Sequence, residues 1–258
     1  HRDEPVFDGQ FSNRCYQQAV RQAFHNFVKK AQRSGRYSHE DDARFTEQWS
    51  RIIMHLPYAY QAKRMFPDVF RHDREDTEMW HEVAKQLGPA PEPHNSDDPV
   101  IIEIWEKAMD GYRRAISKTP QYLDFHASRI EKGQRASSLI GNQYTGSIFL
   151  ALMSTFESDL EENVNLDNKF FGLCGYGSGA KAKVFEGKVS PRWREVVSRW
   201  SLFERLAGRV AIDHITYENL HKGLQSGSVV EPEGEFALVE IGESGVQEGA
   251  RRYKWIDA

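Results

Sequence analysis

The 258-residue sequence contains few cysteines and no long apolar run. Its two cysteines, Cys15 and Cys174, stand in no CxxC or CxxH pattern, which excludes a disulfide framework and a structural zinc site. The longest apolar stretches, such as IFLALM, are far shorter than the roughly 20 residues of a membrane span, and no leader pattern opens the chain. We therefore expect a cytoplasmic protein without a membrane partner.

An excess of one charge sign is also absent. The sequence contains 34 Lys plus Arg residues and 38 Asp plus Glu residues, and the net charge of -4 provides no field that would attract nucleic acid. With 39% hydrophobic and 12% aromatic residues, the chain can build the core of one large domain or two small ones. Its first residue is His1 rather than Met, which is typical of a fragment or a processed product.

Apolar periodicity and turn residues predict a mixed α/β fold. Apolar residues at every fourth position from Cys15 to Ala31 indicate an amphipathic helix that begins at an N-cap, Ser12, and ends at Ser34 and Gly35. After the apolar run that ends at Met54, Pro57 predicts the first turn of a new helix. Further helices are expected around Trp80 and at 100–116, 122–141, 147–156, 192–207 and 216–225, and strands in 169–190, 235–241 and 251–257.

The segment 73–98 is acidic and rich in proline. Such residues are costly to bury, so the segment is expected to be a surface insertion with a short helical piece, away from any reactive site. Apart from this insertion, residues 1–258 are expected to form one carboxyl-terminal domain.

Three junctions carry the candidate reactive groups. His55 precedes the predicted helix, where a helix dipole suits a general acid or base, although capping or pairing with a carboxylate explains the same placement. Asn142 and Ser178 lie between glycines and can donate hydrogen bonds to a ligand, or can serve as ordinary turn residues. Lys63 and Arg64 suit either a phosphate or a solvated helix face.

Four segments resemble, in order, the motifs of a known family. FDGQFSNRCYQQAV, HLPYAYQAK, GNQYTGSIFLAL and GYGSGAKAKVF are similar to the carboxyl-terminal half of hydroxymethylglutaryl-CoA synthase, a member of the thiolase superfamily. The resemblance runs from about residue 7 to residue 189 and implies half of a layered αβαβα architecture. It also implies an acyltransferase of the mevalonate pathway and isoprenoid biosynthesis, which condenses acetyl-CoA with acetoacetyl-CoA and then hydrolyses the acyl-enzyme.

The same resemblance assigns roles to residues. His55 matches the histidine that holds and protonates the ketone oxygen, and Asn142 and Ser178 match residues that hydrogen-bond the acetoacetyl thioester. Tyr144 matches a tyrosine beside the pocket, and Asp8 matches a supporting acid of the motif. The basic pair Lys63 and Arg64 is expected at the phosphate-bearing arm of the substrate, and no cofactor or metal is implied.

The family's nucleophilic cysteine and glutamate base belong to its amino-terminal half, and nothing in this sequence matches them. The expected partner is therefore that half, on the same or a separate chain, and complete units are expected to form a homodimer. Position 60, where enzymes of the mevalonate pathway usually carry a lysine that contacts coenzyme A, is Tyr60. This departure keeps two alternatives open: a polyketide β-branching synthase of the same family that acts on a carrier-protein thioester, or a non-catalytic thiolase-like interaction subunit.

Overall fold

The computed structural model describes residues 8–37, 45–177 and 179–257. The chain divides into two compact units, His1–Leu206 and Ala207–Ala258. The first unit combines helices with a three-stranded sheet, and the second combines a helix with a two-stranded sheet. The predicted mixed α/β class is confirmed. Within the described ranges, no helix has both the length and the apolar character that a membrane crossing requires.

The sheet of the first unit has the strand order β1-β2-β3. Strand β1 (Trp49–Met54) is parallel to β2 (Phe170–Gly177), which is antiparallel to β3 (Lys181–Lys188). The prediction of two strands joined by a glycine turn is confirmed, and Gly179 in that turn has a φ of +83°. Because β1 and β2 are parallel, their carboxyl ends lie at the same edge of the sheet.

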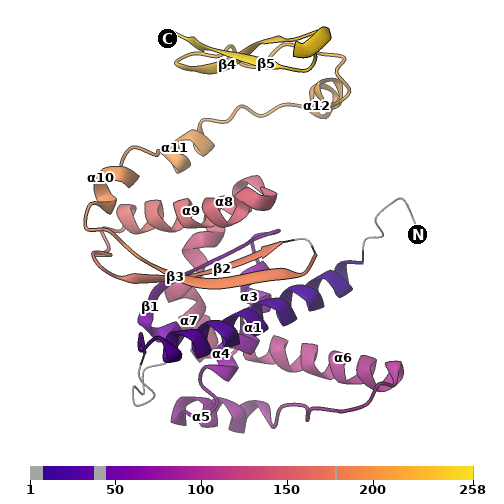
Figure 1. Ribbon diagram of the computed structural model, residues 1–258, viewed down its shortest axis with the longest axis vertical. Helices are drawn as coiled ribbons and strands as arrows, with labels where there is room; N and C mark the ends of the chain where they lie inside the picture. The colour runs from indigo at the N-terminus through magenta and orange to yellow at the C-terminus, as the bar shows by residue number, and fades with distance from the viewer. Residues whose placement is uncertain (1–7, 38–44, 178, 258) are drawn as a thin grey trace. The chain divides into compact units, whose positions relative to one another are not determined.

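Helices cover both faces of this sheet. Figure 1 shows α1 (Gly9–Arg33) on one face and α9 (Ser147–Glu161) on the other. Helix α1 contacts β2 and β3, whereas α9 contacts β1. The sheet is thus the middle layer of three, and the residues that follow its strands lie between helices at one edge.

Helix α1 is the amphipathic helix that the apolar repeat predicts. Its N-cap is Asp8 rather than the predicted Ser12, because the Asp8 carboxylate accepts hydrogen bonds from the backbone N–H groups of residues 10 and 11. The fully buried side chains are those of Tyr16, Val20 and Phe24, together with Ala31. The predicted stripe from Cys15 to Phe27 lies beside this buried face and is only half-buried.

The remaining helices of the first unit are short, except one. They are α2 (Phe45–Gln48), α3 (Gln61–Met65), α4 (Pro67–His72), α5 (Glu78–Leu87), α6 (Pro99–Ile116), α7 (Pro120–Arg129), α8 (Gln134–Ile140), α10 (Trp193–Val197) and α11 (Leu202–Ala207). Thr77, Asp98 and Thr119 cap α5, α6 and α7, and prolines open α6 and α7. The helix predicted at 122–141 is therefore two helices, α7 and α8, separated by a 3-10 turn at Glu131–Gly133.

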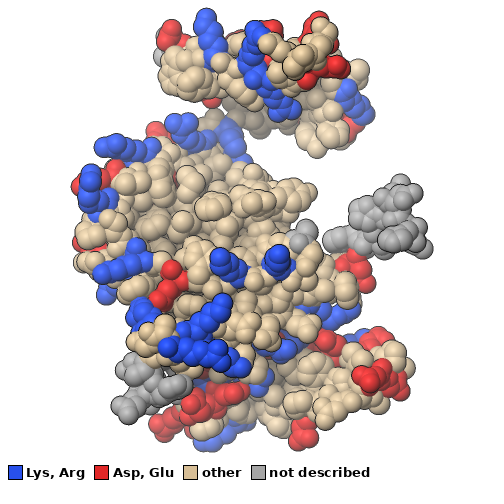
Figure 2. All heavy atoms as spheres, in the orientation of Figure 1, with Lys and Arg blue, Asp and Glu red and all other residues tan. Residues whose placement is uncertain are grey.

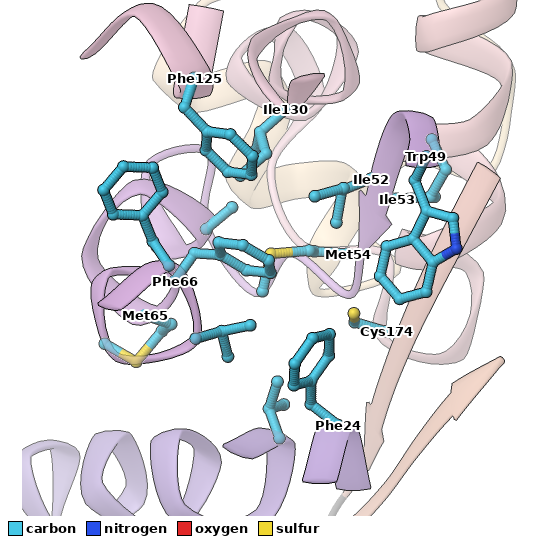
Figure 3. Packing of buried hydrophobic residues seen from close by; sticks show 14 of the residues in the cluster. Phe24, Trp49, Ile52, Ile53, Met54, Met65, Phe66, Phe125, Ile130 and Cys174 are labelled. Carbon is cyan, nitrogen blue, oxygen red and sulfur yellow. The ribbon is translucent and has the colours of Figure 1, made fainter. Parts of the chain in front are cut away.

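The core lies around β1. Figure 3 shows Phe24 of α1, Trp49 and Ile52 of β1, and Cys174 of β2 packed together, with Phe66 following α3. Trp49 is fully buried, with 0% of its surface exposed. This packing fixes β1, and therefore His55 at its end, against α1 and β2.

The segment 73–98 has two parts. Helix α5 contributes Trp80 and Val83 to the core, and Asp73 and Arg74 before it are buried. Residues 89–98 run on to α6 without regular structure and are mostly exposed. Figure 2 shows acidic side chains gathered over the part of the molecule that α5 and α6 form.

The second unit contains α12 (His214–His221) and a hairpin of β4 (Glu235–Ile241) and β5 (Arg251–Ile256). Both strands and the helix were expected from the sequence. The hairpin exposes large apolar side chains, among them Phe236 and Trp255, whose rings meet edge to face at 5.2 Å. Helix α12 and strand β4 have no fully buried residue.

Candidate functional site

The site is built at the edge where β1 and β2 end. His55 directly follows β1, and its backbone N–H donates to the carbonyl oxygen of Cys174 in β2 over 3.0 Å. The backbone carbonyl of His55 accepts a hydrogen bond from the Tyr16 hydroxyl of α1 over 2.8 Å. Both backbone polar groups of His55 are therefore bound by neighbouring elements, so this residue has a fixed place in the fold.

The His55 side chain is half-buried beside an aromatic ring. The centroids of the His55 imidazole and the Tyr176 ring lie 6.4 Å apart. Burial lowers the pKa of His55 from its ordinary value, and no charged side chain of the described residues contributes to that shift. An imidazole with a lowered pKa releases its proton readily when protonated, and its neutral form still donates one N–H group.

The helix expected from Pro57 begins later. Residues 57–60 form a turn, and α3 starts at Gln61. A proline fits the second position of a turn as well as it fits the first turn of a helix, so this part of the prediction is wrong. His55 therefore lies before a turn, and burial, rather than an adjacent helix dipole, accounts for its lowered pKa.

Asn142 organises the turn that leads into α9. Gly141 has a φ of +77°, and the Asn142 side-chain oxygen accepts from the Tyr144 backbone N–H at 2.7 Å and from the Ser147 hydroxyl at 3.1 Å. This network uses the oxygen of the amide, which leaves the Nδ2 donors for a ligand. Tyr144 has a φ of +48°, and 78% of its surface is exposed, so its ring is accessible to a ligand or a partner.

The Asn142 turn lies at the same edge as the end of β2. A Cβ atom placed on Gly175 would lie 3.9 Å from the Ile148 side chain, and Ile148 follows Ser147 at the start of α9. Tyr176, the neighbour of Gly175, lies beside His55. Because successive residues of a strand point to opposite faces, the start of α9 approaches β2 at Gly175 from one face, while Tyr176 packs on Tyr16 of α1 and lies beside His55 on the other face, near the same end of β2.

Ser178, the third predicted donor, lies outside the described residues. Its neighbours Gly177 and Gly179 are described: Gly177 ends β2, and Gly179 precedes β3 in the hairpin turn. The hairpin therefore begins its turn at the strand end that carries Tyr176.

The side chains of Lys63 and Arg64 lie in different surroundings. Arg64 lines a cleft of about 430 Å³ between α1, α3 and α6, and its guanidinium donates to the Tyr58 hydroxyl over 3.1 Å. Lys63 is half-buried and is not among the described residues that line this cleft. The Lys63 backbone carbonyl accepts a hydrogen bond from the Tyr122 hydroxyl over 3.0 Å.

The cleft beside Arg64 carries an excess of positive charge. Its cationic side chains are Arg14, Arg64, Lys107, Arg113 and Arg114, and Asp110 is the one carboxylate among the described residues that line it. Arg113 is held by Asp68 and by Asp110, each over 2.8 Å, and Lys107 by Glu103 over 2.8 Å. Among the described residues, Arg14 and Arg114 have no carboxylate partner within 4.0 Å, although the pKa of Glu103, lowered chiefly by its hydrogen bond from Lys107, is lowered further by the charge of Arg14. The arrangement favours an anionic ligand.

Neither cysteine is placed as an activated nucleophile. Cys174 is fully buried in β2, and burial raises the pKa of its thiol to about 12. Cys15 is half-buried within α1. Asp8, expected to support the site, caps α1 and is exposed. No group of three or more His, Cys, Asp or Glu side chains in the described ranges is arranged to hold a metal ion.

Sequence reasoning missed Tyr16, Tyr176, Arg14 and Arg114. Tyr16 and Tyr176 surround His55, with their ring centroids 4.4 Å apart, and the two arginines line the basic cleft. Tyr176 stands inside the quoted GYGSG motif and could have been singled out there. The other three lie on helices at positions that no local pattern distinguishes, because only the packing of α1 against β2 and the cleft between α1 and α6 give them a role.

Comparison with known proteins identifies similar sequences. A sequence model described as "Hydroxymethylglutaryl-coenzyme A synthase C terminal" matches residues 2–226. The hydroxymethylglutaryl-CoA synthase of Haloferax volcanii is 26% identical over 259 residues, which cover 98% of this chain and 54% of that protein. The synthase of Saccharomyces cerevisiae is 23% identical over 218 residues, which cover 83% of this chain and 41% of that protein.

Solved structures give the fold. The structure of MvaS in complex with 3-hydroxy-3-methylglutaryl coenzyme A has a TM-score of 0.69 and 24% identity, and covers 99% of this chain and 53% of that one. PksG, an HMG-CoA synthase from Bacillus subtilis, has a TM-score of 0.63 and 18% identity, and covers 99% of this chain and 54% of that one. The predicted thiolase-like fold is confirmed. The chain spans about half the length of the curated relatives it matches.

Proposed function

The chain belongs to the hydroxymethylglutaryl-coenzyme A synthase C-terminal family, and we propose on that premise that it is the substrate-binding half of a condensing acyltransferase. The complete enzyme joins acetyl-CoA to acetoacetyl-CoA and forms hydroxymethylglutaryl-CoA for the mevalonate pathway. The observation that carries the proposal is the fixed place of His55 at the end of β1, bound to Cys174 of β2 and beside Tyr176, near the strand end that the start of α9 also approaches.

In this reaction the enolate carbon of an enzyme-bound acetyl thioester attacks the ketone carbon of acetoacetyl-CoA. The carbonyl double bond opens, and its oxygen takes a proton to become the tertiary hydroxyl group of the product. His55 supplies that proton from its imidazole. Water then cleaves the bond between the acyl group and the enzyme thiol, which regenerates the thiol and releases the product carboxylate.

Asn142 holds the thioester arm of the substrate. Its side-chain oxygen is bound within the turn before α9, so the Nδ2 group is the half of the amide that reaches a thioester oxygen. Ser178 is the second donor of this kind by family resemblance. Tyr144, exposed beside Asn142, contacts the acyl chain.

The phosphate-bearing arm is directed toward the basic residues of α3. Arg64 takes part through the cleft between α1, α3 and α6, where Arg14 and Arg114 add positive charge without an ion pair among the described residues. Lys63 precedes Arg64 on the same helix and contributes positive charge to this region. Asp8 acts indirectly, by capping the helix that carries Arg14.

The amino-terminal half of the family supplies the acetylated cysteine and the glutamate base. Support comes from the length of the chain, about half that of its relatives, and from the unsuitable placement of both cysteines. Large apolar side chains are exposed near the site, including Tyr60, Tyr144 and Phe149. An uncovered surface of this kind favours a tight complex with the missing half, and complete units pair as a homodimer.

A carrier-protein substrate is the second candidate. Tyr60 is 66% exposed at the position where a coenzyme A-binding lysine is expected, and structures of similar fold include a curacin-pathway HMG synthase in complex with a donor ACP. A non-catalytic interaction subunit is the third. This reading predicts partner binding without turnover.

The test compares the chain alone with the chain co-expressed with a matching amino-terminal half. Release of free coenzyme A from acetyl-CoA plus acetoacetyl-CoA is followed, and a parallel assay replaces acetoacetyl-CoA with an acetoacetyl carrier protein. We expect turnover only in the paired sample, and faster turnover with coenzyme A. Turnover by the chain alone would contradict the assignment of the missing residues, and a paired complex without turnover on either substrate would favour the interaction subunit.

A further inference from the structure

Tyr16 reaches His55 from a different part of the chain. Its hydroxyl lies 2.8 Å from the His55 backbone oxygen, although 39 residues separate the two positions. Only 1% of the Tyr16 surface is exposed. A buried hydroxyl that donates to a carbonyl at this distance forms a well-ordered bond, and burial raises the pKa of Tyr16 well above its ordinary value, so the donor keeps its proton.

The bond completes the fixation of the His55 backbone. The N–H group of His55 is bound by Cys174 of β2, so the Tyr16 bond holds the opposite side of the same residue from α1. The next residue, Leu56, is fully buried, and the turn at 57–60 follows. The Tyr16 bond thus adds to the hold that β2 and the buried Leu56 have on this strand end.

The Tyr16 ring also supports the side chain beside the imidazole. Tyr16 and Tyr176 lie with ring centroids 4.4 Å apart at an interplanar angle of 56°, and Tyr176 lies 6.4 Å from the His55 ring. The titratable groups that act on Tyr16 are a thiol, Cys174, and two phenols, Tyr176 and Tyr58. The surroundings of His55 on this side are therefore aromatic and uncharged.

We propose that Tyr16 is a positioning residue that sets the place and the environment of the His55 imidazole, through its hydrogen bond to the His55 carbonyl and its packing on Tyr176. This inference rests on the proposed function, in which His55 protonates the ketone oxygen. Proton transfer depends steeply on the distance between donor and acceptor, so a small displacement of the strand end slows the condensation step more than it weakens substrate binding.

The test is Tyr16→Phe in the complete two-half protein. This change removes the hydroxyl and retains the ring that packs on Tyr176. We expect kcat for condensation to fall about tenfold, the KM for acetoacetyl-CoA to stay within about twofold, and acetylation of the cysteine to be unchanged. The His55 imidazole, followed by NMR of protein labelled at histidine carbon, is expected to titrate at higher pH, because a loosened strand end admits water to the ring.

Tyr112→Phe is the matched control. Tyr112 is a buried tyrosine whose hydroxyl lies 3.4 Å from the backbone oxygen of Gly88; it lies on α6, which lines the basic cleft, but is not itself one of the described lining residues. The Tyr112→Phe variant is expected to leave kcat and the His55 titration unchanged. If Tyr16→Phe loses stability but keeps the wild-type kcat and the wild-type His55 titration, Tyr16 is only a packing residue and the proposal is overturned.

A second variant covers the case in which Tyr16→Phe does not fold. Replacement of Tyr16 by p-aminophenylalanine keeps a ring and an N–H donor at the same place, and we expect kcat within about twofold of wild type. A p-methylphenylalanine replacement, of similar size but without a donor, is expected to show the tenfold loss; equal rates for the two would overturn the proposal. The His55 titration needs no turnover, so an inactive complete protein would refute the proposed function and still decide the role of Tyr16.

Discussion

Gly172 of β2 lies directly against the indole ring of Trp49. A Cβ atom added to Gly172 would fall 2.0 Å from Cε3 of Trp49, a separation that no real side chain adopts. Trp49 opens β1, is fully buried, and donates from its indole N–H to Glu186 of β3 over 3.1 Å. The ring has no room to move aside, so the glycine is required by the packing of β1 on β2.

Gly172→Ala is therefore expected to destabilise the protein by about 3 kcal/mol, the upper part of the usual range for overpacking a core. Urea unfolding followed by tryptophan fluorescence measures this loss. Gly177→Ala in the same strand is the control: its added Cβ would meet nothing within 4 Å, so its free energy of unfolding is expected to change by less than about 0.5 kcal/mol. Equal losses in the two variants would contradict this account of the packing.

Asp159 of α9 is a buried charge with two cationic partners. Its carboxylate is 0% exposed and is held by Arg51 over 2.5 Å and by Lys132 over 2.6 Å. Asp159→Ala leaves the largely buried Arg51 without this counter-charge, while Lys132 keeps its pair with Glu162 over 2.7 Å, so we expect a loss of about 3 kcal/mol in the free energy of unfolding.

The neighbouring Glu161→Ala provides a control on the same helix. Glu161 pairs with Arg135, but both side chains are about half exposed, so its removal is expected to cost no more than about 1 kcal/mol. Chemical denaturation of both variants measures the difference. A similar small loss for Asp159→Ala would mean that water reaches the buried pair.

Histidine burial predicts the direction of the pH dependence of stability. Burial is the largest cause of the lowered pKa of His55, His72 and His126. As the pH falls through about 6.5, the unfolded chain takes up protons on these groups before the folded protein does, so the free energy of unfolding decreases. This stability is fully present above pH 6.5 and is lost toward the lower folded-state pKa values.

His126→Gln isolates one of these contributions. His126 is buried beside Gln134, with Glu131 and Lys63 as the charged groups that act on it. Between pH 7 and pH 5.5, the free energy of unfolding of this variant is expected to fall less steeply than that of the wild type. The difference in slope is at most about 1.4 kcal/mol per pH unit. His25→Gln, at an exposed position on α1, is the control for the removal of one imidazole. A wild-type pH dependence in His126→Gln would show that its burial is not linked to protonation.

Asn142→Asp separates the two roles of the Asn142 amide. The aspartate oxygen can still accept from the Tyr144 N–H and the Ser147 hydroxyl, but the Nδ2 donor is gone. We expect the free energy of unfolding to change by less than about 1 kcal/mol and kcat/KM for acetoacetyl-CoA to fall about 10²-fold, the usual cost of removing one such donor.

Gln143→Ala controls for disturbance of the same turn. The Gln143 side chain donates only to the Asn142 backbone oxygen, over 3.2 Å, and is exposed. Steady-state kinetics of the complete protein, with unfolding measured in parallel, compares the two variants. Wild-type kcat/KM for Asn142→Asp would remove Asn142 from the substrate site.

Local signals in the sequence predicted the elements that depend on local chemistry. The hairpin of β2 and β3 was predicted because glycines frame its turn, and α6 because a long apolar pattern continues to Ile116. The break between α7 and α8 was not predicted. Gly133 lies there, and a Cβ atom on it would approach Thr155 and Ala151 of α9 at 3.3 to 3.6 Å. This close approach of distant segments is not encoded in any local pattern.

In the candidate site, too, residues marked by local sequence signals could be predicted, whereas residues placed by distant packing could not. His55 precedes a turn that the sequence marks with proline, and Asn142 stands in one marked with glycine, so both could be named before the structure was known. Tyr16 could not, because its role depends on the packing of α1 across β2 and on the exact end of β1. Trp80 is buried, although it lies in a segment that was predicted to be a surface insertion. The acidic residues around it led to that prediction, and the apolar face of α5 was overlooked.

The central claim is that His55 protonates the ketone oxygen in the condensation step, and His55→Ala in the complete two-half protein tests it most directly. Acetylation of the cysteine by acetyl-CoA and release of product from acetoacetyl-CoA are measured separately. The account predicts a fall of about 10² to 10⁴ in the condensation rate with acetylation unchanged. Condensation at the wild-type rate, or loss of acetylation as well in a folded protein, would contradict it.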